Sequence, residues 1–303
     1  MAGGANKVKR AVAIVNSKIS VKWAAVLLSS STLLSSLLGF YRFRLLNRLY
    51  WGNYQIGLDA YTTAFLIPDF MYFLLVSGAL SVSFIPVLNE KLAKGDKKSA
   101  WQLSSSMINL MALITLIASV LIMIFAAQLI NIIVPDMSED GRALATSMMR
   151  VIAINPFLFA IATVIASMQQ AVGRFTFYAM APAIYNIGII IGALFFTDGI
   201  NLFGWQIFDG GIMGVALGVV LGSVLQLLVS AIGLIGLGFD YEFKIYWKNR
   251  GFRKVLGLLP ARSLDQGLDY VNGLVETNLA SGMSSGTIAA FQQIGRASCR
   301  ERV

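Results

Sequence analysis

Long apolar stretches dominate this chain and are separated by short polar connections. Seven such stretches can be delimited, and an eighth begins near Ser284. Each of the seven is about 20 residues or longer, which is the length of an α-helix that crosses a bilayer. The alternating pattern of about ten residues that is typical of a membrane β-barrel does not occur. The stretches cover residues 24–49, 60–88, 101–134, 143–170, 177–197, 208–237 and 254–280.

The composition agrees with this pattern. Hydrophobic residues make up 57% of the 303 residues and charged residues only 13%, whereas soluble domains carry about 25% charged residues. A soluble enzyme could not bury so much apolar surface, and a disordered or collagen-like chain would contain far less of it. We therefore predict an all-α, polytopic membrane bundle.

The charged residues between the stretches alternate in sign, and the chain carries a formal net charge of +9. Lys and Arg mark cytoplasmic connections, so the pattern predicts a cytoplasmic N-terminus with residues 1–23 as a basic leader. No polar domain carries a basic stripe interleaved with aromatics, which argues against nucleic acid as a partner. The basic connections hold Lys91, Lys94, Lys97, Lys98, Arg174, Lys244, Lys248, Arg250, Arg253 and Lys254, and the acidic ones hold Asp136, Glu139, Asp140, Asp198 and Asp209.

The chain has no histidine and a single cysteine, Cys299. This excludes disulfides, the usual zinc sites and Ser–His–Asp triads. The last ten residues, 294–303, read IGRASCRERV and match a translated sequencing adapter. We interpret them as an artefact, so that native sequence ends near Gln293 and carries no cysteine.

A few charged residues remain at the depth of the membrane. Burying a charge there costs several kcal/mol, so these residues are expected to face a polar cavity or one another. The alternative is snorkelling of a side chain near a helix end. A mixed set that includes arginines suits an anionic head group, because guanidinium binds phosphate oxygens bidentately. The set is Arg42, Arg44, Asp59, Asp69, Arg150, Arg262, Asp265, Asp269 and Glu276.

Small residues also recur within the apolar stretches. Gly214, Gly218 and Gly222 are four residues apart, a spacing that lets two helices approach closely. We assign them to packing and not to chemistry. The serines near the start of the first stretch serve either packing or a cavity wall.

Several motifs, in order, resemble the MurJ/MviN family. The resemblance covers roughly residues 24–293, and it places this chain in the multidrug/oligosaccharidyl-lipid/polysaccharide exporter superfamily. The motifs are LLGFYR (37–42), DAYTTAFLIP (59–68), SGAL (77–80), FIPVL (84–88), GRF (173–175), APAIYN (181–186), LGSVLQL (221–227) and ETNLAS (276–281).

The resemblance implies a flippase that moves lipid II, the lipid-linked peptidoglycan precursor, across the plasma membrane for cell-wall synthesis. Two six-helix lobes would surround a central cavity. Residues 24–238 would form the first lobe, and residues 239–293 would form a cytoplasmic connection, the seventh helix and the start of the eighth. Flipping breaks no bond, so no enzymatic activity is expected. The implied partners are the lipid-linked precursor, membrane lipids and other cell-wall synthesis proteins.

The resemblance also implies roles for individual residues. Arg42, Asp59 and Arg150 match charged positions of the family's first, second and fourth helices. This chain departs from the family at four other positions, where it carries Ser36, Phe43, Tyr72 and Ser77. Arg44 or Arg262 would then compensate in the head-group site. The candidate substrate-binding residues are Arg42, Arg44, Asp59, Arg150 and Arg262.

The seventh stretch carries an unusual polar face. At about 100° per residue, Arg262, Asp265, Asp269 and Glu276 fall within about 60° of one another on a helix. Such a face should line water, or Arg262 should pair with one of the aspartates. Glu276 also matches a family position that binds a coupling cation. The candidate ion-coupling residues are therefore Asp265, Asp269 and Glu276, with Na⁺ or a proton as the ion, Glu276 as the candidate Na⁺ ligand, and no other cofactor.

Three alternatives remain open. A different lipid-linked oligosaccharide flippase or a multidrug exporter of the same superfamily would share the fold. A membrane enzyme acting on a lipid phosphate would need a metal-binding carboxylate cluster or a nucleophile with its base. A scaffold that transports nothing would not depend on Arg42.

Overall fold

A computed structural model describes residues 15–51, 54–77, 83–202, 205–208 and 210–291. Side chains are described within these ranges except at Val21, in the strands at 200–208 and at 260–269. The terminal segment predicted to be an artefact, 294–303, and most of the predicted leader lie outside the described residues.

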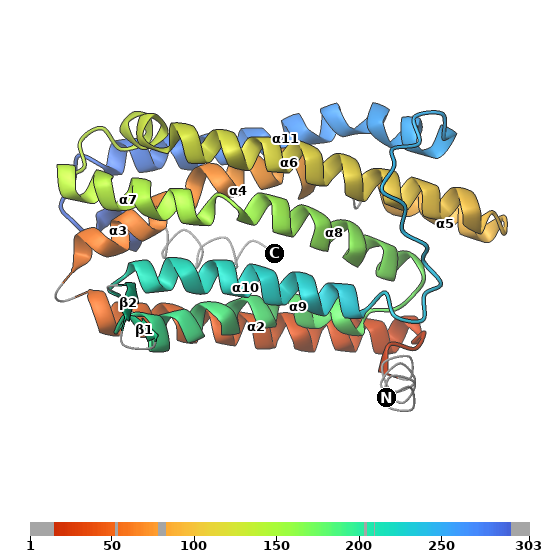
Figure 1. Cartoon of the computed structure of the whole chain (residues 1–303), viewed down its shortest axis with the longest axis horizontal. Coiled ribbons are helices and arrows are strands. Elements are labelled where there is room, and N and C mark those ends of the chain that lie inside the picture. Colours follow the sequence, from red (N-terminus) through yellow and green to blue (C-terminus); the bar gives the residue numbers. More distant parts are fainter. Residues whose placement is uncertain (1–14, 52–53, 78–82, 203–204, 209, 292–303) are drawn as a thin grey trace.

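The chain forms an elongated bundle of helices that run along one common axis (Figure 1). Two short π-helical segments, labelled η1 and η3, extend α4 and α9. In chain order the elements are α2 (Val21–Tyr50), α3 (Gln55–Ala64), α4 (Leu66–Tyr72), η1 (Phe73–Ser77), α5 (Ile85–Ala93), α6 (Lys97–Ile133), α7 (Glu139–Ile152), α8 (Asn155–Ala171), α9 (Thr176–Ile191), η3 (Gly192–Phe196), β1 (Ile200–Leu202), β2 (Trp205–Phe208), α10 (Met213–Ile232) and α11 (Arg250–Ala280).

Five helical segments of the described chain are long and apolar enough to cross a membrane. They cover residues 22–50, 97–133, 139–171, 176–196 and 213–232. The predicted all-α membrane bundle is thereby confirmed. The predicted span 254–280 is also helical and lies within α11.

The predicted span 60–88 is not one continuous helix. It is divided among α3, α4, η1 and α5, with Pro68 inside α4 and Pro86 in the first turn of α5. The predicted span 143–170 is likewise divided between α7 and α8, and Pro156 lies at the start of α8. Proline explains these breaks, because it lacks the N–H of the helical ladder and clashes with the preceding turn.

A two-stranded antiparallel hairpin precedes α10, where the sequence predicted only helix and loop. β1 pairs with β2, with Leu202 opposite Trp205. Gly199 and Gly210 flank the hairpin with φ of 85° and 88°, a conformation that L side chains rarely adopt. The predicted span 208–237 is therefore shorter than expected at its start, since α10 begins only at Met213.

The predicted packing role of the glycines is confirmed between α9 and α10. A Cβ atom on Gly188 would lie 2.2 Å from the Cα of Gly222, and one on Gly192 would lie 2.3 Å from the Cα of Gly218. Neither backbone can retreat from the other, so glycine is required at these crossings. The close approach makes α9 and α10 a rigid pair.

The helices form three groups across the bundle (Figure 1). α2, α9 and α10 lie along one side, α7 and α8 lie in the middle, and α4, α5, α6 and α11 lie along the other side. α2 packs mainly on α9 and only slightly on α3. Its remaining face is open to the surroundings, where Leu33 is 63% exposed and Phe40 is 68% exposed.

The connections that carry basic residues lie at one end of the bundle. The turns from α5 to α6 and from α8 to α9 lie there, together with the connection from α10 to α11 (Figure 1). Hydrogen bonds join the α8–α9 turn to the α10–α11 connection, since Arg174 donates to the carbonyls of Ile235 and Gly236. The acidic turn between α6 and α7 lies at the opposite end.

Candidate functional site

Arg42 lies on α2, the helix whose main packing partner is α9. Its guanidinium carbon lies 4.7 Å above the centre of the Phe43 ring, a cation–π contact. Its Nε atom is buried without a hydrogen-bond partner. Phe43 therefore supplies a ring face to the guanidinium, at a position where the resemblance implies an acid. The guanidinium keeps hydrogen-bonding capacity that no described residue uses.

Arg44 and Arg150 are exposed on two different helices. Arg44 follows Arg42 on α2, and Arg150 lies in the last turn of α7. Within the part of the chain that the structure describes, neither forms an ion pair. Both therefore present free positive charge, but no contact brings them together with Arg42.

Asp59 is buried in α3, with only 5% of its surface exposed. One carboxylate oxygen accepts the N–H of Gly286 at 2.5 Å, and the other accepts the N–H of Ala289 at 2.9 Å. These donors lie in the first turn of a helix that follows α11 and is described over residues 287–291. Asp59 thus caps this helix from a distant part of the chain and does not present a free carboxylate to a substrate.

Sequence reasoning missed this role of Asp59. The segment around Gly286 and Thr287 does carry a local sign of a helix start, since a glycine and a small polar residue precede the apolar run. Gly286 has φ of 92°. The partner of the helix lies more than 200 residues earlier in the chain, and no local pattern indicates a capping residue at that separation.

The polar face predicted on α11 is only partly described. The backbone is helical throughout, which agrees with the spacing used to place Arg262, Asp265 and Asp269 on one face. The side chains of these three residues lie outside the described set. Glu276 is exposed, and the described residues contain no group of three or more His, Cys, Asp or Glu that could hold a metal ion.

The C-terminal part of α11 is anchored beside Glu276. The Asn278 side chain donates to the carbonyls of Ile132 and Ile133 at the end of α6, at 3.1 Å each. These hydrogen bonds satisfy carbonyls that the helix end leaves unpaired. They place Glu276 at the end of the bundle where Asp59 caps the segment after α11.

A row of aromatic rings crosses from α11 to α9, and sequence reasoning did not single it out. Tyr270 stacks on Phe73 with centroids 4.8 Å apart, and Tyr72, Phe159 and Tyr185 continue the row in edge-to-face contacts. The hydroxyl of Tyr72 lies 2.8 Å from that of Thr163. The resemblance implies an arginine at this position, and Tyr72 instead packs among rings there.

Comparison with known proteins gives the family. A sequence model described as "Lipid II flippase MurJ" matches residues 54–294, most of the chain. The chain belongs to the MurJ lipid II flippase family. It is therefore a multi-pass membrane protein of a transporter family, as the sequence motifs predicted.

Several relatives show the same likeness. A probable lipid II flippase MurJ of Buchnera aphidicola subsp. Acyrthosiphon pisum is 25% identical over 263 residues, which are 86% of this chain and 50% of that protein. One from Bdellovibrio bacteriovorus is 28% identical over 273 residues, 88% of this chain and 50% of that protein. The chain thus spans about half the length of these relatives.

A solved structure agrees in three dimensions. It is titled "Lipid II flippase MurJ, inward closed conformation", and it superposes with a TM-score of 0.70 at 26% identity. The match covers 90% of this chain and 54% of that one. The arrangement of helices described above is therefore the arrangement found in about half of a MurJ flippase.

Proposed function

We propose that this chain belongs to a flippase that moves a lipid-linked peptidoglycan precursor, lipid II, across the plasma membrane by alternating access. The observation that carries the proposal is the structural match over 90% of the chain to a lipid II flippase. Residues 24–238 would act as the first lobe. Residues 239–293 would connect it to a second lobe of similar size.

The unused guanidinium of Arg42 supports a role in substrate binding. A charge that is half-buried in a membrane helix is costly unless a partner neutralises it. A pyrophosphate supplies such a partner, because its oxygens match the two-pronged geometry of guanidinium. Arg44, Arg150 and Arg262 would add positive charge around the same head group. No covalent step is required, which is consistent with a transporter and not an enzyme.

Asp59 would act as part of a gate in the same transport cycle. It ties α3 to the segment after α11 at the end of the bundle opposite the basic connections. If the basic end faces the cytoplasm, this contact would close the outer side of the proposed cavity between the lobes. Outward opening would then require the two hydrogen bonds to break.

Transport by Arg42 variants tests the proposed function. In full-length protein reconstituted with lipid II, Arg42→Ala should lower flipping by about tenfold or more, because a charge-assisted contact contributes roughly 1.5–3 kcal/mol. Arg42→Lys should restore only part of the rate, since an ammonium does not bind bidentately. Lys97→Ala, a cation at the basic end, is the matched control.

The same assay separates the alternatives. A multidrug exporter would move a cationic dye and leave lipid II in place, and a scaffold would show no flipping in any variant. Unchanged flipping by Arg42→Ala would remove Arg42 from the substrate site.

A further inference from the structure

A pocket of about 380 Å³ opens where the end of α5 and the starts of α6 and α11 meet. The elements that line it meet at the end of the bundle that carries the basic connections, away from α3 and from the C-terminal end of α11 (Figure 1). Cations outnumber acids in its lining, which favours an anionic ligand. The lining residues are Lys91, Asp96, Ser99, Gln102, Tyr246, Lys248, Asn249 and Arg250.

Hydrogen bonds hold the walls of this pocket together. The Asn249 side chain donates to the carbonyl of Ser99 at 3.0 Å and accepts the N–H groups of Gly251 and Phe252. The N–H of Tyr246 donates to the hydroxyl of Ser106 at 2.8 Å. The connection before α11 is therefore fixed to α6, and the pocket exists before any ligand arrives.

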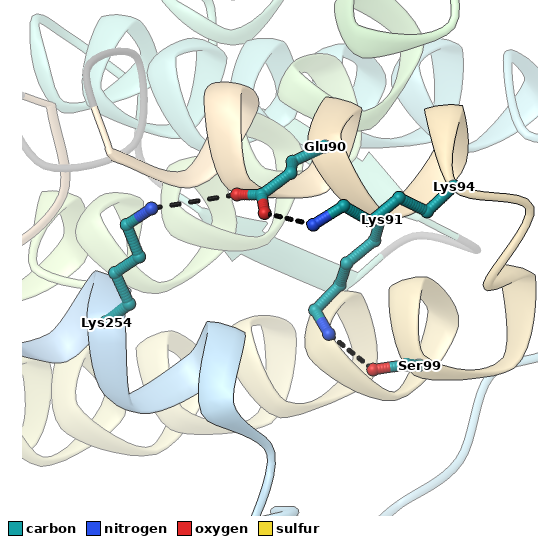
Figure 2. Close-up of polar contacts among 5 residues, drawn as sticks. All are labelled: Glu90, Lys91, Lys94, Ser99 and Lys254. Carbon is teal, nitrogen blue, oxygen red and sulfur yellow. Dashed lines mark hydrogen bonds and ion pairs between the residues drawn. The ribbon is translucent and has the colours of Figure 1, made fainter.

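The three cations of the pocket have no acidic partner in the described parts of the chain. The Lys91 ammonium donates to the hydroxyl of Ser99, a neutral group (Figure 2). Lys248 and Arg250 are exposed and form no ion pair there. The lone acid, Asp96, uses its carboxylate to accept the N–H of Ser99 and cap α6.

Two carboxylates beside the pocket are already occupied, since Glu242 accepts the hydroxyl of Tyr246 and Glu90 is paired with lysines. Glu90 lies 2.7 Å from the Lys94 ammonium and 3.6 Å from that of Lys254 (Figure 2). The hydrogen bond from Lys94 and the charges of both lysines lower the pKa of Glu90. Glu90 therefore stays ionised at neutral pH and is shared between lysines that lie outside the pocket, so Lys91 gains no counter-charge from it.

We propose that this pocket binds a phosphate group. Two ammonium groups and a guanidinium around one hollow match the negative charge and the several acceptor oxygens of phosphate. The phosphate would bridge Lys91 on α5 to Lys248 and Arg250 at the start of α11. This bridge would hold the connection between the lobes against α6. Its source is either the head group of an anionic lipid or a soluble phosphate compound, and the site does not depend on the proposed transport.

The test compares two triple variants of the full chain, purified in detergent. The pocket variant is Lys91→Gln, Lys248→Gln, Arg250→Gln. The control, Lys97→Gln, Lys98→Gln, Arg253→Gln, removes the same charge from exposed residues at the same end. Binding of inorganic phosphate and of dioctanoyl phosphatidylglycerol is measured by thermal shift and by isothermal titration, with dioctanoyl phosphatidylcholine as the reference lipid.

The parent and the control should bind a probe at least about tenfold more tightly than the pocket variant, which corresponds to one lost charge-assisted contact. Preference for phosphatidylglycerol over inorganic phosphate identifies a lipid head group, and the reverse identifies a soluble anion. Equal losses in both variants, or no binding of either probe to the parent, overturn the proposal. If the triple variant misfolds, Lys248→Gln and Arg250→Gln singly replace it, because both side chains are exposed.

Discussion

Glu276 and Asp59 show how differently two membrane acids can be placed. Asp59 has both carboxylate oxygens occupied by backbone N–H groups. Glu276 is exposed on α11, about two turns after Asp269 on the polar face that begins at Arg262. An acid with free lone pairs can take up a cation or a proton, whereas a capping acid cannot without breaking its hydrogen bonds. We therefore propose Glu276, with Asp269 and Asp265, as the site of ion coupling.

Neutralising Glu276 should uncouple transport from the ion gradient. In reconstituted full-length protein, Glu276→Gln keeps the size of the side chain but removes the charge that attracts Na⁺ or H⁺. The rate of lipid II flipping should then be the same with and without an imposed Na⁺ gradient, pH gradient or membrane potential. Glu139→Gln, an exposed acid of the α6–α7 turn, should respond as the parent does. A parent-like response of Glu276→Gln would remove it from coupling.

At the scale of secondary-structure elements, two contacts join segments that are distant in the sequence and differ in kind. Gly188 and Gly222 bring α9 and α10 into backbone contact, which makes a rigid pair within the proposed first lobe. Asp59 joins α3 to the segment after α11 through two buried hydrogen bonds. The first contact leaves no room for another arrangement, whereas the second would have to break if Asp59 acts as the proposed gate.

Substitution at the glycine contact should destabilise the fold. Gly188→Ala places a methyl group against the Gly222 backbone, and overpacking of this kind costs about 1–3 kcal/mol. The melting temperature, followed by tryptophan fluorescence, should fall by several degrees. Gly257→Ala on α11 is the control, because no atom lies within 4 Å of its added methyl group. It should leave the melting temperature unchanged or slightly raised; an equal fall in both would refute the packing role.

Removing the Asp59 cap should loosen the segment after α11. Asp59→Ala deletes both acceptors, and charged hydrogen bonds contribute roughly 1.5–3 kcal/mol each. Amide hydrogen exchange at Gly286 and Ala289 should become at least about tenfold faster. Exchange within α6 should not change, which serves as the internal control. Asp59→Asn should fall between the parent and Asp59→Ala, and identical exchange in all three proteins would rule out the cap.

At the scale of the whole molecule, charge is segregated between the two ends of the bundle. Basic connections gather at one end, and the acidic α6–α7 turn lies at the other (Figure 1). Lys and Arg are retained on the cytoplasmic side during insertion, so the basic end, the N-terminus and the phosphate pocket should face the cytoplasm. Asp59 and Glu276 would then lie toward the exterior.

Cysteine labelling tests this orientation. After Cys299→Ser, a membrane-impermeant maleimide should label Glu139→Cys in intact cells and should not label Lys97→Cys. Both residues are exposed in the structure, so both should react once the cells are permeabilised. Labelling of Lys97→Cys alone in intact cells would reverse the predicted topology.

The sequence by itself determined the membrane class, the approximate helical stretches and the family. The class and the stretches follow from local properties, because an apolar run long enough to cross a bilayer has almost no alternative to a helix. The family follows from the ordered series of short motifs. The glycine spacing of α10 also predicted close packing, since the spacing is itself a local signal.

Only the tertiary structure decided the partners of individual side chains. It showed that Asp59 caps a helix more than 200 residues away and that Tyr72 belongs to a row of packed rings. It also showed that Gly188 of α9 and Gly192 of η3 are the partners of the α10 glycines. It also brought Lys91 to the same pocket as Lys248 and Arg250. Such partners are set by how distant helices cross, and crossing depends on side-chain packing between elements, which no local pattern records.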